Sequence, residues 1–230
     1  MRLLGILGGM SWTSTVEYYR LLNHGVSQRL GGLHSANLLL RSVDFAPLAA
    51  MQHEGDWAGT VAVLVEAARA LERAGAEGLL LATNTMHKVA GELEAAGGIP
   101  LLHIADATAA RVRADGRRVV GLLATAFTME QDFYVGRLRS NGLEVLVPDA
   151  DDRADVHRII YDELCLDVVR ADSRQRYREV IARLAQRGAE GIILGCTEVG
   201  LLVGANDSPV PVYDTTAIHA AQALDWMLAT

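Results

Sequence analysis

The sequence predicts an α/β protein with two pseudo-symmetric lobes, each a mainly parallel sheet flanked by helices. Short apolar segments, which are typical of buried strands, alternate along the chain with segments whose apolar residues recur at helical spacing. The chain also repeats itself, because three segments of its first half match three of its second half in the same order and at nearly the same offset. We therefore expect two similar lobes related by a pseudo-twofold axis.

Strands are expected where the chain is apolar over four to eight residues between glycines or polar residues. In chain order these segments are Arg2–Leu7, Asn37–Val43, Gly78–Ala82, Arg117–Ala124, Leu143–Val147 and Gly191–Leu194. The expected helices are Val61–Ala74, Met86–Glu94, Asp172–Arg187 and Val199–Val203. The first and third of these helices end at Gly75 and Gly188, and glycine commonly terminates helices because it adopts positive φ.

The repeat also places the lobes and the expected active site. The three matches pair Leu71–Leu81 with Leu184–Leu194, Arg2–Leu7 with Arg118–Leu123, and Ile99–Leu102 with Val210–Tyr213. We place the first lobe at residues 1–103 with 215–230, and the second at residues 104–214. Ligands of open parallel sheets bind beyond the carboxyl ends of the strands, so the active site is expected between the lobes.

Composition excludes several classes of protein. Half of the 230 residues are apolar, which is ample for a packed core. The net charge of −7 argues against a nucleic-acid partner, which would require a basic face. No apolar run reaches the roughly 18 residues of a membrane span, and the N-terminal apolar segment breaks into glycines too early for a secretory signal. A cytoplasmic protein without a membrane partner is expected.

The scarcity of cysteine and lysine limits the cofactor. Cys165 and Cys196 are too few for a disulfide framework, and the seven histidines are scattered singly, so no metal site is expected. Lys88 is the only lysine, and nothing else in the chain suggests a Schiff base with pyridoxal phosphate. The Gly8-Gly9 pair lacks the G-x-G-x-x-G pattern of a dinucleotide loop. We expect no cofactor.

The repeat aligns two loops that carry candidate site residues. Thr83 and Cys196 occupy equivalent positions at a strand end, and small polar residues and an expected helix follow each of them. The amides of a helix N-terminus bind carboxylates, and the same position is expected to lower the pKa of the Cys196 thiol. N-capping alone is the alternative interpretation of Asn84, Thr85 and Thr197. Cys165 is expected to pack within a helix.

These loops resemble those of the aspartate/glutamate racemase family, whose members racemise amino acids without a cofactor. The resemblance covers essentially the whole chain and is carried by Gly5–Trp12, Ser42–Phe45, Thr83–His87 and Gly195–Glu198. The first motif of the family is usually Cys-Asn-Thr-x-His, so Thr83 stands where a cysteine is common. The resemblance implies that Cys196 moves the α-proton and that Thr83, which does not titrate, is a weaker partner. Such a variant is associated with a preference for the L-enantiomers.

The resemblance also implies a dicarboxylic amino acid as the substrate and a homodimer as the assembly. The catalytic residues are expected to be Cys196 and Thr83, the substrate-binding residues Met10, Gln52, Asn84, Thr85, Thr125 and Thr197, and the supporting residues Asp44 and Glu198. Some members of the family carry a lysine where Cys165 stands, so Gln52, with Arg41 behind it, is the candidate for the distal carboxylate. The alternative for Gln52 is an exposed helix residue. His87 is expected to be structural.

Two other functions remain open at this point. A decarboxylase of malonate-type acids also uses one cysteine to protonate a carbanion, and it would release carbon dioxide. A non-catalytic amino-acid sensor could have lost one catalytic cysteine, and its ligand would stabilise it thermally without any hydrogen exchange at the α-carbon.

Overall fold

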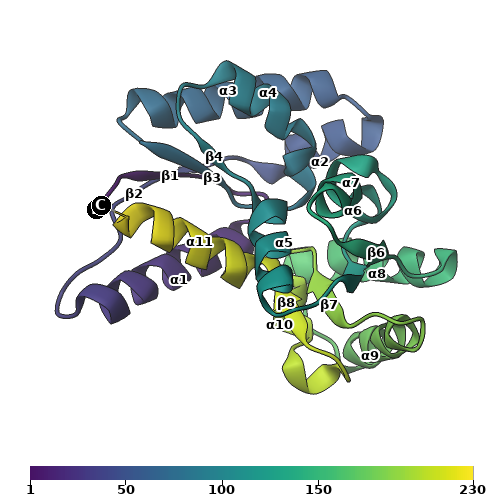
Figure 1. The fold of residues 1–230 in the computed structure, drawn as a ribbon. Helices are drawn as coiled ribbons and strands as arrows, with labels where there is room; N and C mark the ends of the chain where they lie inside the picture. Colours follow the sequence, from purple (N-terminus) through teal and green to yellow (C-terminus); the bar gives the residue numbers. More distant parts are fainter. Residues whose placement is uncertain (230) are drawn as a thin grey trace. The chain divides into compact units, whose positions relative to one another are not determined.

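The computed structural model describes residues 1–229 and confirms the α/β class (Figure 1). The chain forms two compact units, each built on a four-stranded sheet in which every paired strand is parallel. Unit 1 consists of Met1–His103 and the C-terminal segment from His219, and unit 2 consists of Ile104–Ile218.

Unit 1 has the strand order β2-β1-β3-β4. Its strands are β1 (Leu4–Gly8), β2 (Leu38–Ser42), β3 (Gly78–Leu81) and β4 (Leu101–Leu102). Its helices are α1 (Trp12–Leu30), α2 (Phe45–Glu54), α3 (Trp57–Arg73), the 3-10 helix η1 (Thr85–Val89), α4 (Ala90–Ala96) and most of α11 (Thr215–Leu228).

Helices cover both faces of the unit 1 sheet, as Figure 1 shows, with α3 and α4 on one face and α1 and α11 on the other. The alternation of side chains along the strands produces the two layers of core. Leu79 and Leu81 of β3 pack with α3 and α4, whereas Leu80 and Ala82 pack with α1 and α11. The two central strands, β1 and β3, are therefore buried on both faces, which explains why they lack polar side chains.

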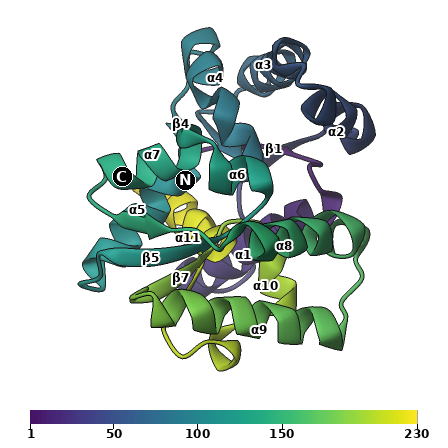
Figure 2. The same cartoon turned by 90° about the vertical axis from the view of Figure 1, so that its right-hand side faces the viewer.

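Unit 2 repeats the arrangement with the strand order β6-β5-β7-β8. Its strands are β5 (Val119–Leu123), β6 (Glu144–Leu146), β7 (Gly191–Leu194) and β8 (Val212–Asp214). Its helices are α5 (Ile104–Ala114), α6 (Ala126–Glu130), α7 (Asp132–Ser140), α8 (Ala150–Asp162), η2 (Leu164–Leu166), α9 (Ala171–Gln186), α10 (Val199–Leu202) and η3 (Ala205–Asp207), with the first turn of α11. Figure 2 shows α9 running beneath β7, where its apolar face joins the unit 2 core.

The repeat extends to equivalent hydrogen bonds. In unit 1 the amide of Glu77 donates to the Leu3 carbonyl at 2.8 Å, and in unit 2 the amide of Glu190 donates to the Val119 carbonyl at 2.8 Å. The side chain of each glutamate also accepts a hydrogen bond from the backbone where the first strand of its sheet begins, Glu77 from the Leu3 amide at 2.6 Å and Glu190 from the equivalent Val119 amide at 3.0 Å. In both units, therefore, equivalent glutamate hydrogen bonds join the turn between helix and strand to the neighbouring strand.

Two equivalent glycines form those corners. Gly75 ends α3 with φ of 101°, and Gly188 follows α9 with φ of 102°. Positive φ is strained for other residues, so glycine is needed to reverse the chain from helix to strand. The match between the two segments is thus explained by a shared backbone requirement as well as by shared apolar strands.

Two expectations about local structure are wrong. The segment Met86–Glu94 is not one helix, because it divides into η1 and α4 at Val89, whose φ of −105° and ψ of 21° are not helical. Cys165 does not lie within an α-helix either, because α8 ends at Asp162 and Cys165 occupies the short 3-10 turn η2.

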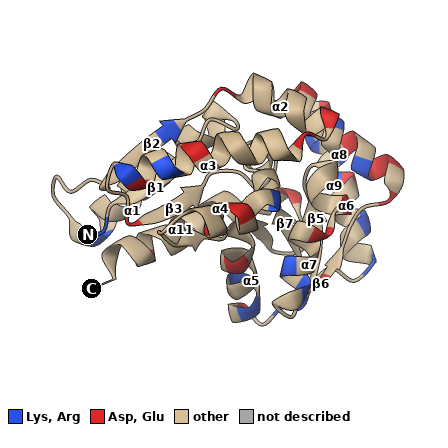
Figure 3. Ribbon diagram, turned by 90° about the horizontal axis from the view of Figure 1, so that it is seen from above, with Lys and Arg blue, Asp and Glu red and all other residues tan. Residues whose placement is uncertain are grey.

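Charged residues of both signs are carried largely by helices such as α5, α8 and α9 (Figure 3). On α9, Arg176 and Arg183 both contact the buried carboxylate of Asp152, at 2.8 and 2.7 Å, and Arg174 contacts Asp207 at 2.9 Å. These ion pairs lie within unit 2. Across residues 1–229, no helix combines the length and the apolar character needed to span a membrane.

Candidate active site

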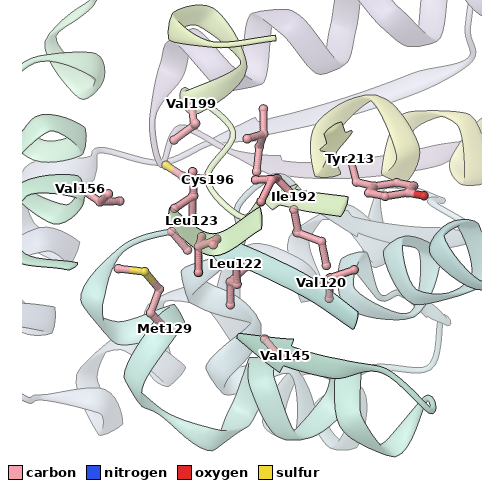
Figure 4. Packing of buried hydrophobic residues seen from close by; sticks show 14 of the residues in the cluster. Val120, Leu122, Leu123, Met129, Val145, Val156, Ile192, Cys196, Val199 and Tyr213 are labelled. Carbon is pink, nitrogen blue, oxygen red and sulfur yellow. The ribbon is translucent and has the colours of Figure 1, made fainter. Parts of the chain in front are cut away.

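Cys196 follows β7 at its carboxyl end, as the sequence predicts. The amide of Gly195 donates to the Leu123 carbonyl at 2.7 Å, which extends the pairing of β7 with β5 and fixes the start of the loop. The Cys196 side chain is 8% exposed and packs against the unit 2 core beside Val199 (Figure 4). The thiol is therefore held by a rigid strand end rather than by a free loop.

A buried carboxylate lies next to this thiol. Cys196 Sγ donates to Glu198 Oε2 at 3.0 Å, and Thr197 Oγ1 donates to the same oxygen at 2.6 Å. Glu198 is 3% exposed. One carboxylate oxygen thus accepts hydrogen bonds from both predicted site residues of this loop, and Glu198 holds the thiol in one orientation.

The expectation that the loop lowers the pKa of Cys196 is wrong. Burial raises the pKa of the thiol well above its ordinary value, and the negative charges of Glu198 and Cys165 raise it further. The following helix α10 has only four residues, so its dipole is too small to offset these effects. The Cys196 thiol is protonated at neutral pH, and its thiolate would be a strong base.

Cys165 and Tyr161 of unit 2 interact electrostatically with this thiol, and Thr125 follows the neighbouring strand. Thr125 follows β5, the strand next to β7, and its buried hydroxyl lies 3.2 Å from that of Thr128. Cys165 is half-buried against the unit 2 core, and burial followed by the charge of Glu198 raises its pKa. Burial also raises the pKa of Tyr161, with contributions from Cys165, Cys196 and Glu198.

Tyr161 is a candidate site residue that sequence reasoning missed. Its phenol interacts electrostatically with Cys165, Cys196 and Glu198, which places it in the same cluster. The signal in the sequence is its spacing, because Tyr161 lies four residues before Cys165, which the sequence places in a helix.

In unit 1 the predicted loop residues Thr83, Asn84 and Thr85 follow β3 and are all buried. The amide of Ala82 donates to the Leu7 carbonyl at 2.9 Å, so this loop begins with the same bond to the neighbouring strand as the Cys196 loop does. The two loops are thus equivalent in the repeat, as predicted.

Met10 and Gln52 lie close to the Thr83 loop within unit 1. Met10 follows β1, is buried, and belongs to the same apolar cluster as Met86 of η1. Gln52 is 2% exposed on α2, and its Nε2 donates to Met86 Sδ at 3.2 Å. The alternative that Gln52 is an exposed helix residue is therefore wrong.

Arg41 and Asp44 lie on the surface of unit 1. Arg41 is an exposed residue of β2. Asp44 caps α2, because its Oδ1 accepts from the Ala46 amide at 3.2 Å. This capping contact accounts for Asp44 locally, and its supporting role in catalysis stays a prediction.

Three histidines that are far apart in the sequence come together in unit 1. The ring of His87 lies 4.5 Å from that of His103 and 6.0 Å from that of His219, measured between centroids. All three side chains are buried. His87 also contacts the Thr83 loop, because its Nδ1 lies 2.7 Å from the Thr83 carbonyl oxygen.

Lys88, the residue next to His87, lies against an aromatic ring. Lys88 Nζ lies 3.7 Å from the centroid of the Trp57 ring, and burial lowers the pKa of this amine. Within residues 1–229, no three His, Cys, Asp or Glu side chains are arranged to hold a metal ion.

Comparisons with known proteins bear on the family and the fold. The sequence profile of the Asp/Glu/hydantoin racemase family matches residues 7–223. A similar curated protein is the broad-specificity amino-acid racemase RacX of Bacillus subtilis, which is 25% identical over 72% of this chain and 71% of its own length.

Solved structures are similar over the full chain. A Yersinia pestis protein with a provisional Asp/Glu racemase assignment is 54% identical, with a TM-score of 0.93 and complete coverage of both chains. The aspartate racemase homologue PH1733 of Pyrococcus horikoshii is 33% identical, with a TM-score of 0.85 and the same coverage.

Proposed function

We propose that this chain, which belongs to the Asp/Glu/hydantoin racemase family, racemises aspartate and glutamate without pyridoxal phosphate and favours the L-enantiomer. The single observation that carries the proposal is the buried Cys196 thiol at the carboxyl end of β7, hydrogen-bonded to Glu198. A buried thiol beside a carboxylate is suited to moving a proton on and off carbon.

The α-hydrogen of an amino acid is a very weak acid, so its removal requires a strong base. Burial and the charge of Glu198 raise the pKa of Cys196, which makes its thiolate more basic. The thiol first gives its proton to hydroxide or another base of the solvent, so the hydrogen-bonded Glu198 carboxylate keeps its charge. The thiolate then takes the α-proton and leaves its electron pair on carbon as a planar carbanion.

Racemisation requires that a proton return to the opposite face of this carbanion. We propose that Thr83 serves that face, by its hydroxyl or by a water molecule that it holds. A hydroxyl does not titrate in the ordinary range, so this face returns the proton more slowly than Cys196 does. Return from Cys196 regenerates the L-enantiomer, so exchange of the α-hydrogen is expected to outpace racemisation.

The remaining predicted residues are proposed to bind the substrate. Asn84, Thr85, Thr125 and Thr197 are small polar residues at strand ends, and their hydroxyl, amide and backbone groups would hold the α-carboxylate and stabilise the developing charge. Gln52, which is buried against Met86, is the candidate for the distal carboxylate.

The proposal includes the cytoplasm as the location and a homodimer as the assembly. Catalysis by Cys196 requires a reduced thiol, which the cytoplasm maintains. On α1, Trp12, Val16 and Tyr19 share one stripe and are each more than half exposed, which supports pairing with a second copy. Light scattering of the wild type and of Tyr19→Glu measures the mass, and a monomeric wild type would refute the dimer.

The activity is tested with Cys196→Ser and with Cys165→Ser as its matched control. The control removes the other thiol of unit 2, which is less buried and makes no hydrogen bond to Glu198. Proton NMR in D₂O follows loss of the α-hydrogen of L-aspartate and L-glutamate. We expect exchange to vanish in Cys196→Ser and to persist in Cys165→Ser. Equal exchange in the wild type and in Cys196→Ser would refute the assignment.

A further inference from the structure

His87 contacts the backbone of the proposed catalytic threonine. It lies on η1, four residues after Thr83, and its Nδ1 is 2.7 Å from the Thr83 carbonyl oxygen. A carbonyl oxygen only accepts hydrogen bonds, so the proton must be on Nδ1 of the imidazole. The 3-10 turn supports the same geometry, because the His87 amide donates to the Asn84 carbonyl at 3.1 Å.

The neighbouring histidines hold the His87 ring in place. His219 is anchored at both nitrogens, because Nε2 donates to the Leu102 carbonyl at 2.7 Å and Nδ1 accepts from the Tyr18 hydroxyl at 2.9 Å. His103 directly follows β4, and the centroid of its ring lies 4.5 Å from the centroid of the His87 ring. These anchors come from α1, α11 and β4, which are elements of the same rigid core as β3.

This arrangement costs more than an apolar core would. Buried imidazoles must be hydrogen-bonded to be tolerated, and aliphatic side chains would fill the same space without that requirement. A packing role alone does not explain why the His87 ring donates a hydrogen bond to the Thr83 carbonyl oxygen. Because a peptide plane is rigid, fixing this carbonyl limits the positions that the Thr83 side chain can take.

We propose that His87 is a positioning residue that orients the Thr83 loop for proton return to the face opposite Cys196. This inference rests on the proposed function. It assigns His87 to one of the two proton transfers only: the exchange catalysed by Cys196 does not depend on the Thr83 carbonyl, whereas inversion does. Loss of the hydrogen bond should therefore lower racemisation without lowering exchange.

Two substitutions separate the hydrogen bond from the bulk of the ring. In His87→Asn the side-chain amide nitrogen falls near the place of Nδ1 and can still donate to Thr83. In His87→Gln the longer side chain carries its amide toward the place of Nε2. We expect the ratio of racemisation to α-deuterium exchange, measured on L-glutamate in one D₂O sample, to fall about tenfold in His87→Gln, as for one lost hydrogen bond. In His87→Asn it should stay within about twofold of the wild type.

A matched control is available in the same unit. The exposed His53 of α2 makes the same contact, with Nδ1 2.7 Å from the Ala49 carbonyl oxygen, so His53→Gln should leave the ratio unchanged. The preserved exchange rate reports that the variants are folded.

The outcomes separate this inference from the function it rests on. If the wild type shows no exchange, the proposed function itself fails. If the wild type exchanges and racemises but His87→Gln keeps its ratio, or loses exchange and racemisation together, the positioning role is refuted and the proposed function stands. An equal fall of the ratio in His87→Asn and His87→Gln also refutes the role, because it would exclude the Thr83 hydrogen bond as the cause.

Discussion

Glu198→Gln removes a negative charge that lies within hydrogen-bonding distance of the Cys196 thiol, and we expect the pKa of that thiol to fall. The two groups are 3.0 Å apart. Coulomb's law at this distance, with an effective dielectric constant of about 20, gives roughly 5.5 kcal/mol, or about 4 pKa units, as an upper limit. Burial is the larger cause of the raised pKa and is unchanged by the substitution. A fall of at least about one unit is therefore expected.

The measurement uses a Cys165→Ser background, in which Cys196 is the only cysteine. The ultraviolet absorbance of the thiolate is followed against pH as the difference from a Cys165→Ser/Cys196→Ser variant, so that tyrosine ionisation cancels and one group is reported. Exchange of the α-hydrogen gives a second readout, because its rate rises with pH as the thiolate forms and this rise should move to lower pH by the same amount. The limiting rate should also fall on the order of threefold per unit, since a less basic thiolate removes protons more slowly.

An unchanged or higher thiol pKa in Glu198→Gln would refute this account of the site. It would mean that the Glu198 carboxylate does not carry the charge that sets the basicity of Cys196. A lower pKa with an unshifted exchange profile would contradict a different step, because the thiolate of Cys196 would then not be the base.

Further predictions concern the second face and the stability of the two units. Thr83→Cys supplies a second thiol and should raise racemisation relative to exchange at least about tenfold; no rise in a folded variant would contradict the role of Thr83. Gly75→Ala and Gly188→Ala should each lower the free energy of unfolding in urea by about 1 kcal/mol or more, because both glycines have positive φ. Gly91→Ala is the control, because Gly91 lies in a helix with open space around it, and this substitution should raise the free energy of unfolding by about 0.5 kcal/mol. Burial lowers the pKa of His219 to about 4, so the stabilisation from its neutral ring is complete above the unfolded pKa of 6.5 and is lost as pH falls from 6.5 to about 4. Between pH 7 and pH 5 the free energy of unfolding should fall by about 2 kcal/mol more in the wild type than in His219→Gln. An equal fall in the two proteins would contradict this.

The architecture could be predicted because local signals and the repeat agree. Buried parallel strands are continuously apolar, and Gly75 and Gly188 mark equivalent corners whose positive φ the sequence can signal directly. The repeat could also align Thr83 with Cys196, because position in the sequence fixes which strand end each residue follows.

The details that the sequence did not predict depend on turn geometry, on burial and on contacts between distant segments. The break at Val89 follows from a 3-10 turn rather than from a breaking residue. The raised pKa of Cys196 results from burial and from Glu198, which outweigh the short helix α10. The histidine cluster joins residues from η1, β4 and α11, and no local pattern brings His87 and His219 together.

The central claim is that one face of the substrate has a competent base and the other has a weak one. A single experiment tests it most directly: L-glutamate is incubated with the wild-type protein in D₂O, and α-deuterium incorporation by NMR and formation of D-glutamate by chiral chromatography are measured in the same sample. The account predicts that exchange with retention of the L-configuration is faster than formation of D-glutamate, and that D-glutamate as substrate exchanges more slowly. Equal rates of exchange and racemisation, or faster exchange of D-glutamate, would contradict it.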